Sequence, residues 1–184
     1  MGLKEKLYTA EEFWDFCQLP ENDGRRFELV DGEIVEMAGS SLPNSSASLY
    51  IGSLLMMYGR KTGLGRAFGA DGSTRLTNNL IRIPDASFIS KARLATVEGK
   101  LMPPPDLAVE VVSPDEDIFK KTREYLYNGV TEVWAVYTDS QELIIFNLDE
   151  DGNLANKRYG INDIIRNRPI LPNFEMAIGD IFSD

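Results

Sequence analysis

The sequence predicts an α/β fold in which a central mixed β-sheet is flanked by helices. Of its 184 residues, 43% are hydrophobic, which is enough to fill the core of one compact domain. Two almost continuous apolar runs, Leu107–Val112 and Val133–Val136, have the composition of strands buried on both faces. A helix-like stretch separates them, and helical and strand patterns alternate elsewhere. Because the chain shows no repeat or linker, we predict a single domain over residues 1–184.

An N-terminal helix and a β-hairpin are expected to come first. Thr9-Ala10-Glu11-Glu12 is a capping box, and the helix that it begins should run to about Cys17. The apolar segments Phe27–Val30 and Glu33–Met37 flank Asp31-Gly32. Asp-Gly favours the positive φ angles of a two-residue turn, so these segments should pair as a hairpin.

A long helix with a broad apolar face is predicted from about Asn44 to Arg60, since apolar residues recur there at helical spacing. Its apolar positions include Leu49, Ile51, Leu55 and Met57, and the glycines that follow should end it. Short strands are expected afterwards at Arg66–Ala70, Thr74–Leu76 and Ile81–Ile89.

In the C-terminal half, Leu107–Val112 should be a buried strand in which Glu110 is the one charged residue. Ser113-Pro114-Asp115 should open a helix that extends to about Asn128 and is closed by Gly129. After Val133–Val136, a final hairpin is expected from Leu143–Asn147 and Asn156–Tyr159 around the turn Asp149–Asn153.

The composition excludes several classes of site. The chain has no histidine, which removes Ser-His-Asp and Cys-His triads, histidine zinc sites and histidine general bases. Its one cysteine, Cys17, cannot form an intramolecular disulfide. The net charge of −10 argues against a surface that is basic all over, although a local basic patch remains compatible with it. No apolar run is long enough for a membrane span, and the N-terminus lacks the apolar core of a signal peptide. We therefore expect a cytoplasmic protein without a membrane partner.

Two carboxylates stand where a strand interior makes them costly. Asp85 comes directly before an apolar run, Glu110 lies within another, and Lys121 falls on the following predicted helix. Mg²⁺, or Mn²⁺ in its place, prefers oxygen ligands and needs one or two carboxylates together with water and a substrate phosphate. The lysine would orient or deprotonate a water molecule, or neutralise charge on the phosphate. The alternative is structural: Asp85 caps a turn, and Glu110 pairs with a lysine or an arginine.

Several phrases of the sequence together resemble one family. They are Glu28 within RFELVDGEIVEM, then RIPDASFI, PPDLAVEVVSP, the spacing Asp117-x3-Lys121-x3-Tyr125, and GVTEVW. In this order they are similar to the Uma-two family, restriction-endonuclease-like proteins of the PD-(D/E)XK nuclease superfamily. The resemblance runs from about Thr9 to about Phe174. It implies a restriction-endonuclease-like core and Mg²⁺-dependent hydrolysis of DNA phosphodiester bonds.

The family pattern assigns roles to four residues as expectations. Asp85 matches the aspartate of the PD element, and Glu110 matches the acidic residue of (D/E)XK, so these two would hold the metal. Val112 stands where the motif has its lysine, and Lys121 on the following helix would replace it. Glu28 matches a recurrent glutamate that would add a third acidic group. The expected catalytic residues are therefore Asp85, Glu110, Lys121 and Glu28.

The sequence also departs from the family pattern. Asn44 or a neighbouring serine stands where relatives often have histidine, and Tyr137 stands where an aspartate often follows a strand. DNA is the expected partner, and a homodimer is a further expectation. The basic residues that could steer DNA are Arg25, Arg26, Arg60, Lys61, Arg66, Arg75 and Arg82. Two other functions stay open, namely a non-catalytic interaction protein that retains the nuclease fold, and a hydrolase of a small phosphoester.

Overall fold

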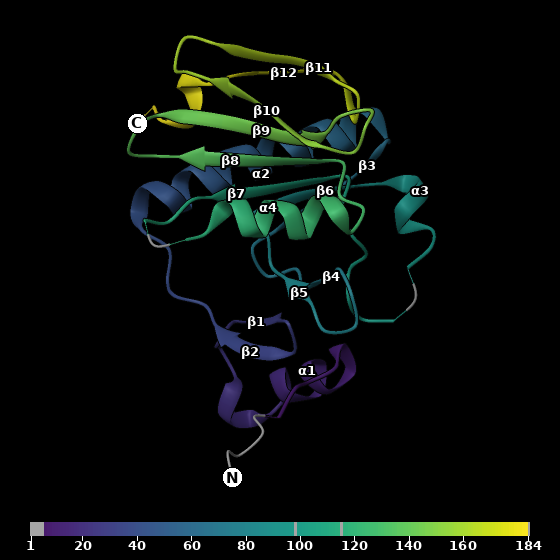
Figure 1. Ribbon diagram of the computed structural model, residues 1–184. Coiled ribbons are helices and arrows are strands. Elements are labelled where there is room, and N and C mark those ends of the chain that lie inside the picture. The colour runs from purple at the N-terminus through teal and green to yellow at the C-terminus, as the bar shows by residue number, and fades with distance from the viewer. Residues whose placement is uncertain (1–5, 98, 115, 184) are drawn as a thin grey trace.

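A six-stranded sheet forms the centre of the protein in a computed structural model, which describes residues 6–97, 99–114 and 116–183 (Figure 1). The strand order is β10-β9-β8-β7-β6-β3. The central strands β7 and β8 are parallel and the other neighbours are antiparallel, which confirms the predicted mixed sheet. The strands are β3 (Gly65–Gly69), β6 (Ala86–Ser90), β7 (Leu107–Val111), β8 (Glu132–Tyr137), β9 (Glu142–Leu148) and β10 (Leu154–Tyr159).

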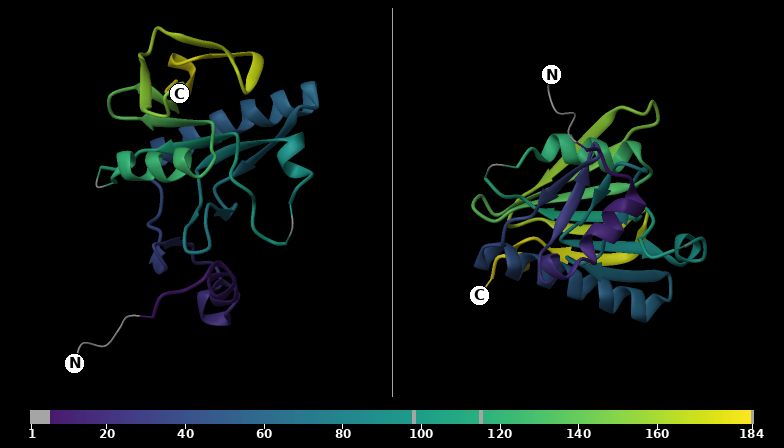
Figure 2. Two further views of the ribbon diagram at one scale, coloured as in Figure 1. Left: turned by 45° about the vertical axis from the view of Figure 1, so that its right-hand side comes forward. Right: turned by 90° about the horizontal axis from the view of Figure 1, so that it is seen from below.

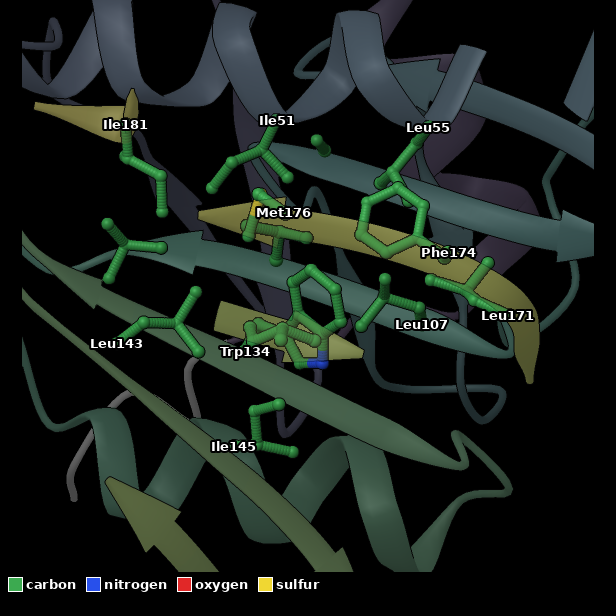
Figure 3. Packing of buried hydrophobic residues seen from close by; sticks show 14 of the residues in the cluster. Ile51, Leu55, Leu107, Trp134, Leu143, Ile145, Leu171, Phe174, Met176 and Ile181 are labelled. Atoms are coloured by element: carbon green, nitrogen blue, oxygen red, sulfur yellow. The ribbon is translucent and has the colours of Figure 1, made fainter. Parts of the chain in front are cut away.

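Helices cover both faces of this sheet (Figures 1 and 2). Helix α2 (Leu42–Thr62) packs on one face together with the hairpin of β11 (Ile164–Arg168) and β12 (Leu171–Ala177). Helix α4 (Ile118–Tyr127) packs on the other face, and it also supplies the crossover that the parallel pair β7 and β8 requires. In the larger core, side chains of α2, the sheet and β12 interlock around Trp134 (Figure 3).

Helix α2 has a narrower buried stripe than its sequence predicts. Ser41 caps its start, and Gly63 ends it with a left-handed φ of 69°. Ile51 and Leu55 are fully buried against the sheet, but Leu49 and Met57, which we expected on the same apolar face, are 71% and 55% exposed. The apolar residues of this helix therefore point in two directions, and those that face solvent are Leu42, Leu49, Met56 and Met57.

The N-terminal part forms a second, smaller sheet in the order β2-β1-β5-β4 (lower part of Figure 1). Its elements are α1 (Ala10–Cys17), the 3₁₀ helix η1 (Pro20–Asn22), β1 (Phe27–Val30), β2 (Glu33–Glu36), β4 (Thr74–Arg75) and β5 (Ile81–Arg82). The predicted capping box is present, with Thr9 and Glu12 each bonding the other's amide. The turn between β1 and β2 has φ of 53° at Asp31 and 86° at Gly32, as the Asp-Gly pair predicts.

Two expectations about helices and strands need correction, and one pair of strands was not expected. The predicted strand Ile81–Ile89 is two strands in different sheets, β5 and β6, because Pro84 between them cannot donate to a ladder. Helix α4 begins at Ile118 with Asp117 as its N-cap, later than the predicted Ser113-Pro114-Asp115, and Asp115 lies outside the described residues. The pair β11 and β12 was not predicted. The remaining short helices are α3 (Lys91–Leu94) and the 3₁₀ helix η2 (Gly179–Ile181).

Candidate active site

Asp85 lies at the point where the chain enters β6. Its Oδ2 accepts a hydrogen bond of 2.7 Å from the amide of Val111, the residue after Glu110. One peptide unit of β7 therefore connects the two carboxylates that the sequence singles out. Burial raises the pKa of Asp85, while the Val111 hydrogen bond and the charge of Lys121 partly oppose that rise. Oδ1 accepts no hydrogen bond from any residue that the structure describes.

Glu110 lies in the middle of β7 and is only 2% exposed. Strand alternation turns its side chain toward α4. There Oε2 accepts from the Lys121 ammonium at 2.8 Å, and Oε1 accepts from the Tyr125 hydroxyl at 2.6 Å. Burial raises the pKa of Glu110 to about 8; Lys121 lowers it, and the charges of Asp85 and Glu116 raise it further. A further cation beside this carboxyl group would lower its pKa again.

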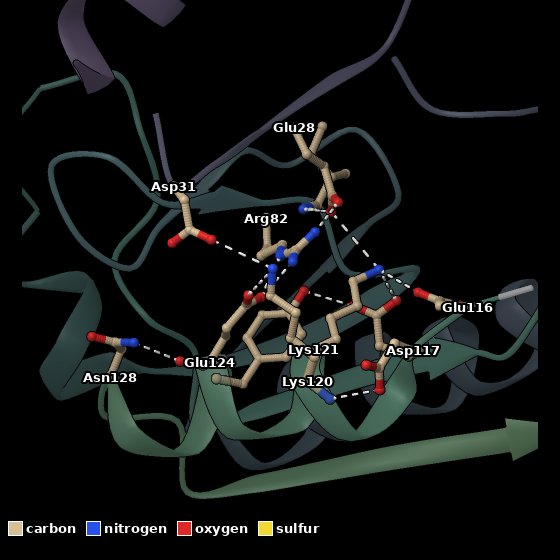
Figure 4. Close-up of polar contacts among 12 residues, drawn as sticks. Glu28, Asp31, Arg82, Glu116, Asp117, Lys120, Lys121, Glu124 and Asn128 are labelled. Atoms are coloured by element: carbon tan, nitrogen blue, oxygen red, sulfur yellow. Dashed lines mark hydrogen bonds and ion pairs between the residues drawn. The ribbon is translucent and has the colours of Figure 1, made fainter. Parts of the chain in front are cut away.

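Lys121 reaches this carboxylate from the buried face of α4 and is 7% exposed. Its Nζ lies 2.8 Å from Glu110 Oε2, 2.8 Å from Glu116 Oε1 and 3.8 Å from Glu28 Oε1 (Figure 4). Burial alone would lower the pKa of Lys121, but the charges of these three glutamates outweigh it and raise the pKa above its usual value. The side chain is therefore a buried cation surrounded by an excess of acids.

Glu28 uses both of its oxygens in contacts with β5 and the segment that follows. Oε1 accepts from the Ile83 amide at 2.9 Å, and Oε2 accepts from the Arg82 guanidinium at 2.6 Å. Arg82 also donates to Glu124 of α4 at 2.8 Å, so this arginine connects the smaller sheet to α4 (Figure 4). The sequence suggested Arg82 as a surface contact for DNA, but the side chain is buried between two glutamates.

A family described as "Uma2: Putative restriction endonuclease" matches residues 11–179. The chain belongs to the Uma2 family. A solved structure of "a putative nuclease belonging to DUF820" from Anabaena variabilis is 18% identical, with a TM-score of 0.76. The match covers 95% of this chain and 97% of that one, and it shows that the two share a fold. No curated protein matches the sequence.

In this Uma2 chain, sequence reasoning missed two neighbours of the candidate site. Glu116 binds Lys121 from the segment before α4, and Tyr125 binds Glu110 from within α4. The sequence could have placed Tyr125 at the site, because Lys121 and Tyr125 are four residues apart and therefore share one face of a helix. For Glu116 the sequence showed only that its segment is acidic, which does not predict a contact with Lys121. Asn44, which with a neighbouring serine was a candidate for the position of the family histidine, accepts a hydrogen bond of 2.7 Å from the Thr138 hydroxyl.

The donor set of this site suits a hard cation held by two carboxylates. Asp85 and Glu110 offer oxygen, which Mg²⁺ prefers, and Asp85, but not Glu110, lines a cavity of about 390 Å³ beside α2 and β3. Among the described residues, no group of three or more cysteine, aspartate or glutamate side chains is arranged to hold a metal. Glu28 is occupied by Arg82, Glu116 by Lys121, and Glu110 by both Lys121 and Tyr125. A cation shared by Asp85 and Glu110 would therefore use the Asp85 oxygen that accepts no hydrogen bond from a described residue, and it would have to displace the Lys121 ammonium from Glu110.

The basic residues expected to steer DNA fall into three groups. Arg26 is half-buried and donates to the carbonyl oxygens of Ala70 at 3.3 Å and Ala38 at 3.5 Å. Arg25 and Arg75 form surface ion pairs with Glu36 and Glu11, and Arg82 is buried, so these three carry little free charge. Arg60, Lys61 and Arg66 are exposed, and no described residue forms an ion pair with them. As for membranes, none of the described helices is both long and apolar enough to cross one.

Proposed function

We propose that the protein is a nuclease that hydrolyses DNA phosphodiester bonds with the help of Mg²⁺ or Mn²⁺. The observation that carries the proposal is the arrangement around β7. Buried Glu110 accepts from Lys121 at 2.8 Å, and Asp85 is bonded to the very next amide. Membership in a family described as putative restriction endonucleases supports the same conclusion.

Asp85 and Glu110 would be the protein ligands of the metal, which when bound would neutralise phosphate charge and activate a water molecule. Lys121 can move its ammonium from Glu110 to a phosphate oxygen or to the attacking water, because its stem is flexible and its partners are acidic. Tyr125 fixes the orientation of Glu110 through its 2.6 Å hydrogen bond. Glu116 and Glu28 act as positioning residues that keep Lys121 charged and close to β7.

A plasmid-nicking assay tests the proposal. Wild-type protein is incubated with supercoiled DNA and either Mg²⁺ or Mn²⁺, with a chelator in the control. We expect nicking that depends on the metal and is lost in Asp85→Asn and in Glu110→Gln. Equal nicking by wild type and both variants would assign the activity to something other than this site.

A second candidate is a non-catalytic interaction protein that keeps the nuclease fold. The contacts of Lys121 favour it, because an ammonium that already satisfies Glu110 and Glu116 can serve as a permanent structural cation. The two candidates differ in metal binding. A nuclease is stabilised by Mg²⁺ or Mn²⁺ through Asp85, whereas a purely structural cluster gains nothing from either ion.

A further inference from the structure

We propose that a groove between α2 and β3 leads the DNA backbone from Asp85 to a phosphate-binding pocket formed by Arg60, Arg66 and Lys91. The inference rests on the proposed nuclease function and adds the path of the substrate. It also assigns to three exposed cations a role that the Asp85 and Glu110 site does not give them.

The pocket is a cavity of about 880 Å³ that residues of α2, β3 and α3 line. Arg60 comes from the last turn of α2, Arg66 from β3 and Lys91 from the start of α3. All three are exposed, and none forms an ion pair with a residue in the described part of the chain. In a protein with a net charge of −10, three cations around one cavity, none of them paired with an acid in the described part of the chain, locally reverse the sign of the overall charge.

Two glycines bring these elements together. A Cβ on Gly65 would lie 2.3 Å from the carbonyl oxygen of Ile89, and one on Gly59 would lie 2.7 Å from the carbonyl oxygen of Gly65. Both distances are too short for any side chain. Glycine at position 59 therefore allows the last turn of α2 to lie directly on β3, and glycine at position 65 allows β3 to lie close to β6. This close packing places Arg60 and Arg66 on the rim of the same cavity.

The helix dipole accounts for part of this arrangement only. Cations in the last turn of a helix stabilise its negative end, which is a sufficient reason for Arg60 and for its neighbour Lys61. It gives no reason for Arg66 on a strand or for Lys91 at the beginning of another helix. The convergence of cations from three elements fits an anionic ligand better than helix stabilisation.

The basic pocket adjoins the cavity at Asp85. Met56 and Ala67 line both cavities, and the wall on the Asp85 side consists mainly of small residues such as Gly52 and Ser53. The Ser48 hydroxyl donates to the carbonyl oxygen of Asp85 at 3.0 Å and so marks the Asp85 end of the groove on α2.

The distance between the two ends of the groove along α2 fits two phosphates that lie a few nucleotides apart on one DNA strand. Arg60 follows Ser48 by twelve positions, which is about 18 Å along a helix that rises about 1.5 Å per residue. One strand of DNA rises about 3.4 Å per nucleotide, so the phosphate held in the pocket lies at most about five nucleotides from the one at Asp85.

The side chains around the pocket select the backbone and not the bases. Among its described lining residues there is no aromatic ring for a base to stack on and no Asn or Gln to read adenine. Arginine binds phosphate bidentately, and lysine binds it as a point charge. The pocket should therefore hold DNA of any sequence.

A binding experiment with charge-matched variants tests this path. Fluorescence anisotropy measures the affinity for labelled duplex DNA at several salt concentrations, with chelator present to prevent cleavage. The pocket variant is Arg60→Gln/Arg66→Gln/Lys91→Gln. The control is Arg123→Gln/Lys157→Gln/Arg166→Gln, which removes three exposed cations from α4, β10 and β11 and gives the same net charge.

We expect the pocket variant to bind at least about tenfold more weakly than the control, and the slope of log K against log salt to flatten by about 1, because the pocket holds one phosphate.

An equal loss of affinity in both variants would contradict the proposed DNA path. If the wild type still nicked DNA in a metal-dependent way, the proposed nuclease function would remain supported. A specific loss in the pocket variant without any nicking by the wild type would support the groove and contradict the nuclease. A wild-type protein that neither binds nor nicks DNA would contradict both proposals.

Discussion

Two buried glutamates on neighbouring strands, Glu110 of β7 and Glu132 of β8, show how differently the same side chain can be used. Each is 2% exposed. Glu132 accepts from the guanidinium of Arg168 at 2.6 Å and from the indole of Trp134 at 3.0 Å. Glu110 accepts from Lys121 and from the Tyr125 hydroxyl. Both acids are therefore satisfied by one cation and one neutral donor.

The difference lies in the charges that surround each pair. Glu132 and Arg168 form a pair of one anion and one cation with forked geometry, and solvent reaches the arginine, which is 21% exposed. The cation at Glu110 is shared with Glu116 and approached by Glu28, and Asp85 raises the pKa of Glu110 further. Burial of an acid is thus a poor sign of function by itself. The surplus of carboxylates at Glu110 distinguishes it as the proposed metal ligand.

The sharpest test of this comparison exchanges each glutamate for glutamine. Glu110→Gln should lower the rate of plasmid nicking by about 10³-fold, because it removes a charge that the proposed metal requires. The melting temperature of Glu110→Gln should stay within a few degrees of wild type. The variant loses an ion pair with Lys121, but it also removes one of several mutually repelling buried acids.

Glu132→Gln is the matched control and should show the reverse. It leaves Arg168 without its partner, so the free energy of unfolding should fall by about 3 kcal/mol, while nicking stays within a few-fold of wild type. If Glu132→Gln abolishes nicking and Glu110→Gln does not, the two glutamates have been assigned the wrong way round.

A second test concerns the cation at Glu110. Lys121→Met should reduce nicking by about 10²-fold, because methionine lacks the positive charge with which Lys121 is proposed to hold the water or the phosphate. Lys120→Met is the control: Lys120 is exposed, contacts Asp31 and Glu124 at 3.4 and 3.8 Å, and should be nearly silent.

Adding Val112→Lys to Lys121→Met should restore part of the activity. Val112 is half-buried on the face of β7 that packs toward α4, the same face as Glu110. Restoration would show that the ammonium works from either position. Unchanged nicking in Lys121→Met alone would remove the lysine from the mechanism.

A smaller effect is expected on stability when metal is added. Mg²⁺ or Mn²⁺ should raise the melting temperature of the wild type by several degrees once its concentration is far above Kd, because it binds the native state. Differential scanning fluorimetry should show the rise in wild type and Glu132→Gln but not in Asp85→Asn. The same rise in all three proteins would place the cation elsewhere.

The smallest effect should be a pH dependence of stability without metal. Burial raises the pKa of Glu110 from its ordinary value of 4.5 to about 8, so between these pH values Glu110 binds more protons in the folded than in the unfolded state. The free energy of unfolding should therefore fall as pH rises from about 4.5 to about 8, by at most about 1.4 kcal/mol per pH unit from this group. Urea unfolding should show a shallower fall in Glu110→Gln. A fall that is equally steep there would contradict the raised pKa.

Local features were well determined by the sequence. The capping box at Thr9, the turn at Asp31-Gly32 and the helix end at Gly63 depend on residues that are near neighbours in the chain, so the sequence alone could reveal them. The buried character of β7 was visible in its apolar run, and the order of motifs identified the family and with it the fold.

Charge partners and exposure were decided by the tertiary structure. Arg82 is separated from Glu28 by 54 positions, and Glu132 from Arg168 by 36, so no local pattern distinguishes these ion pairs from free surface charges. Glu132 resembled any other polar residue at a strand end, and Leu49 resembled a core residue of α2. Which side of a helix meets the sheet, and which acid meets which cation, depends on contacts between distant segments that form only when the whole chain packs.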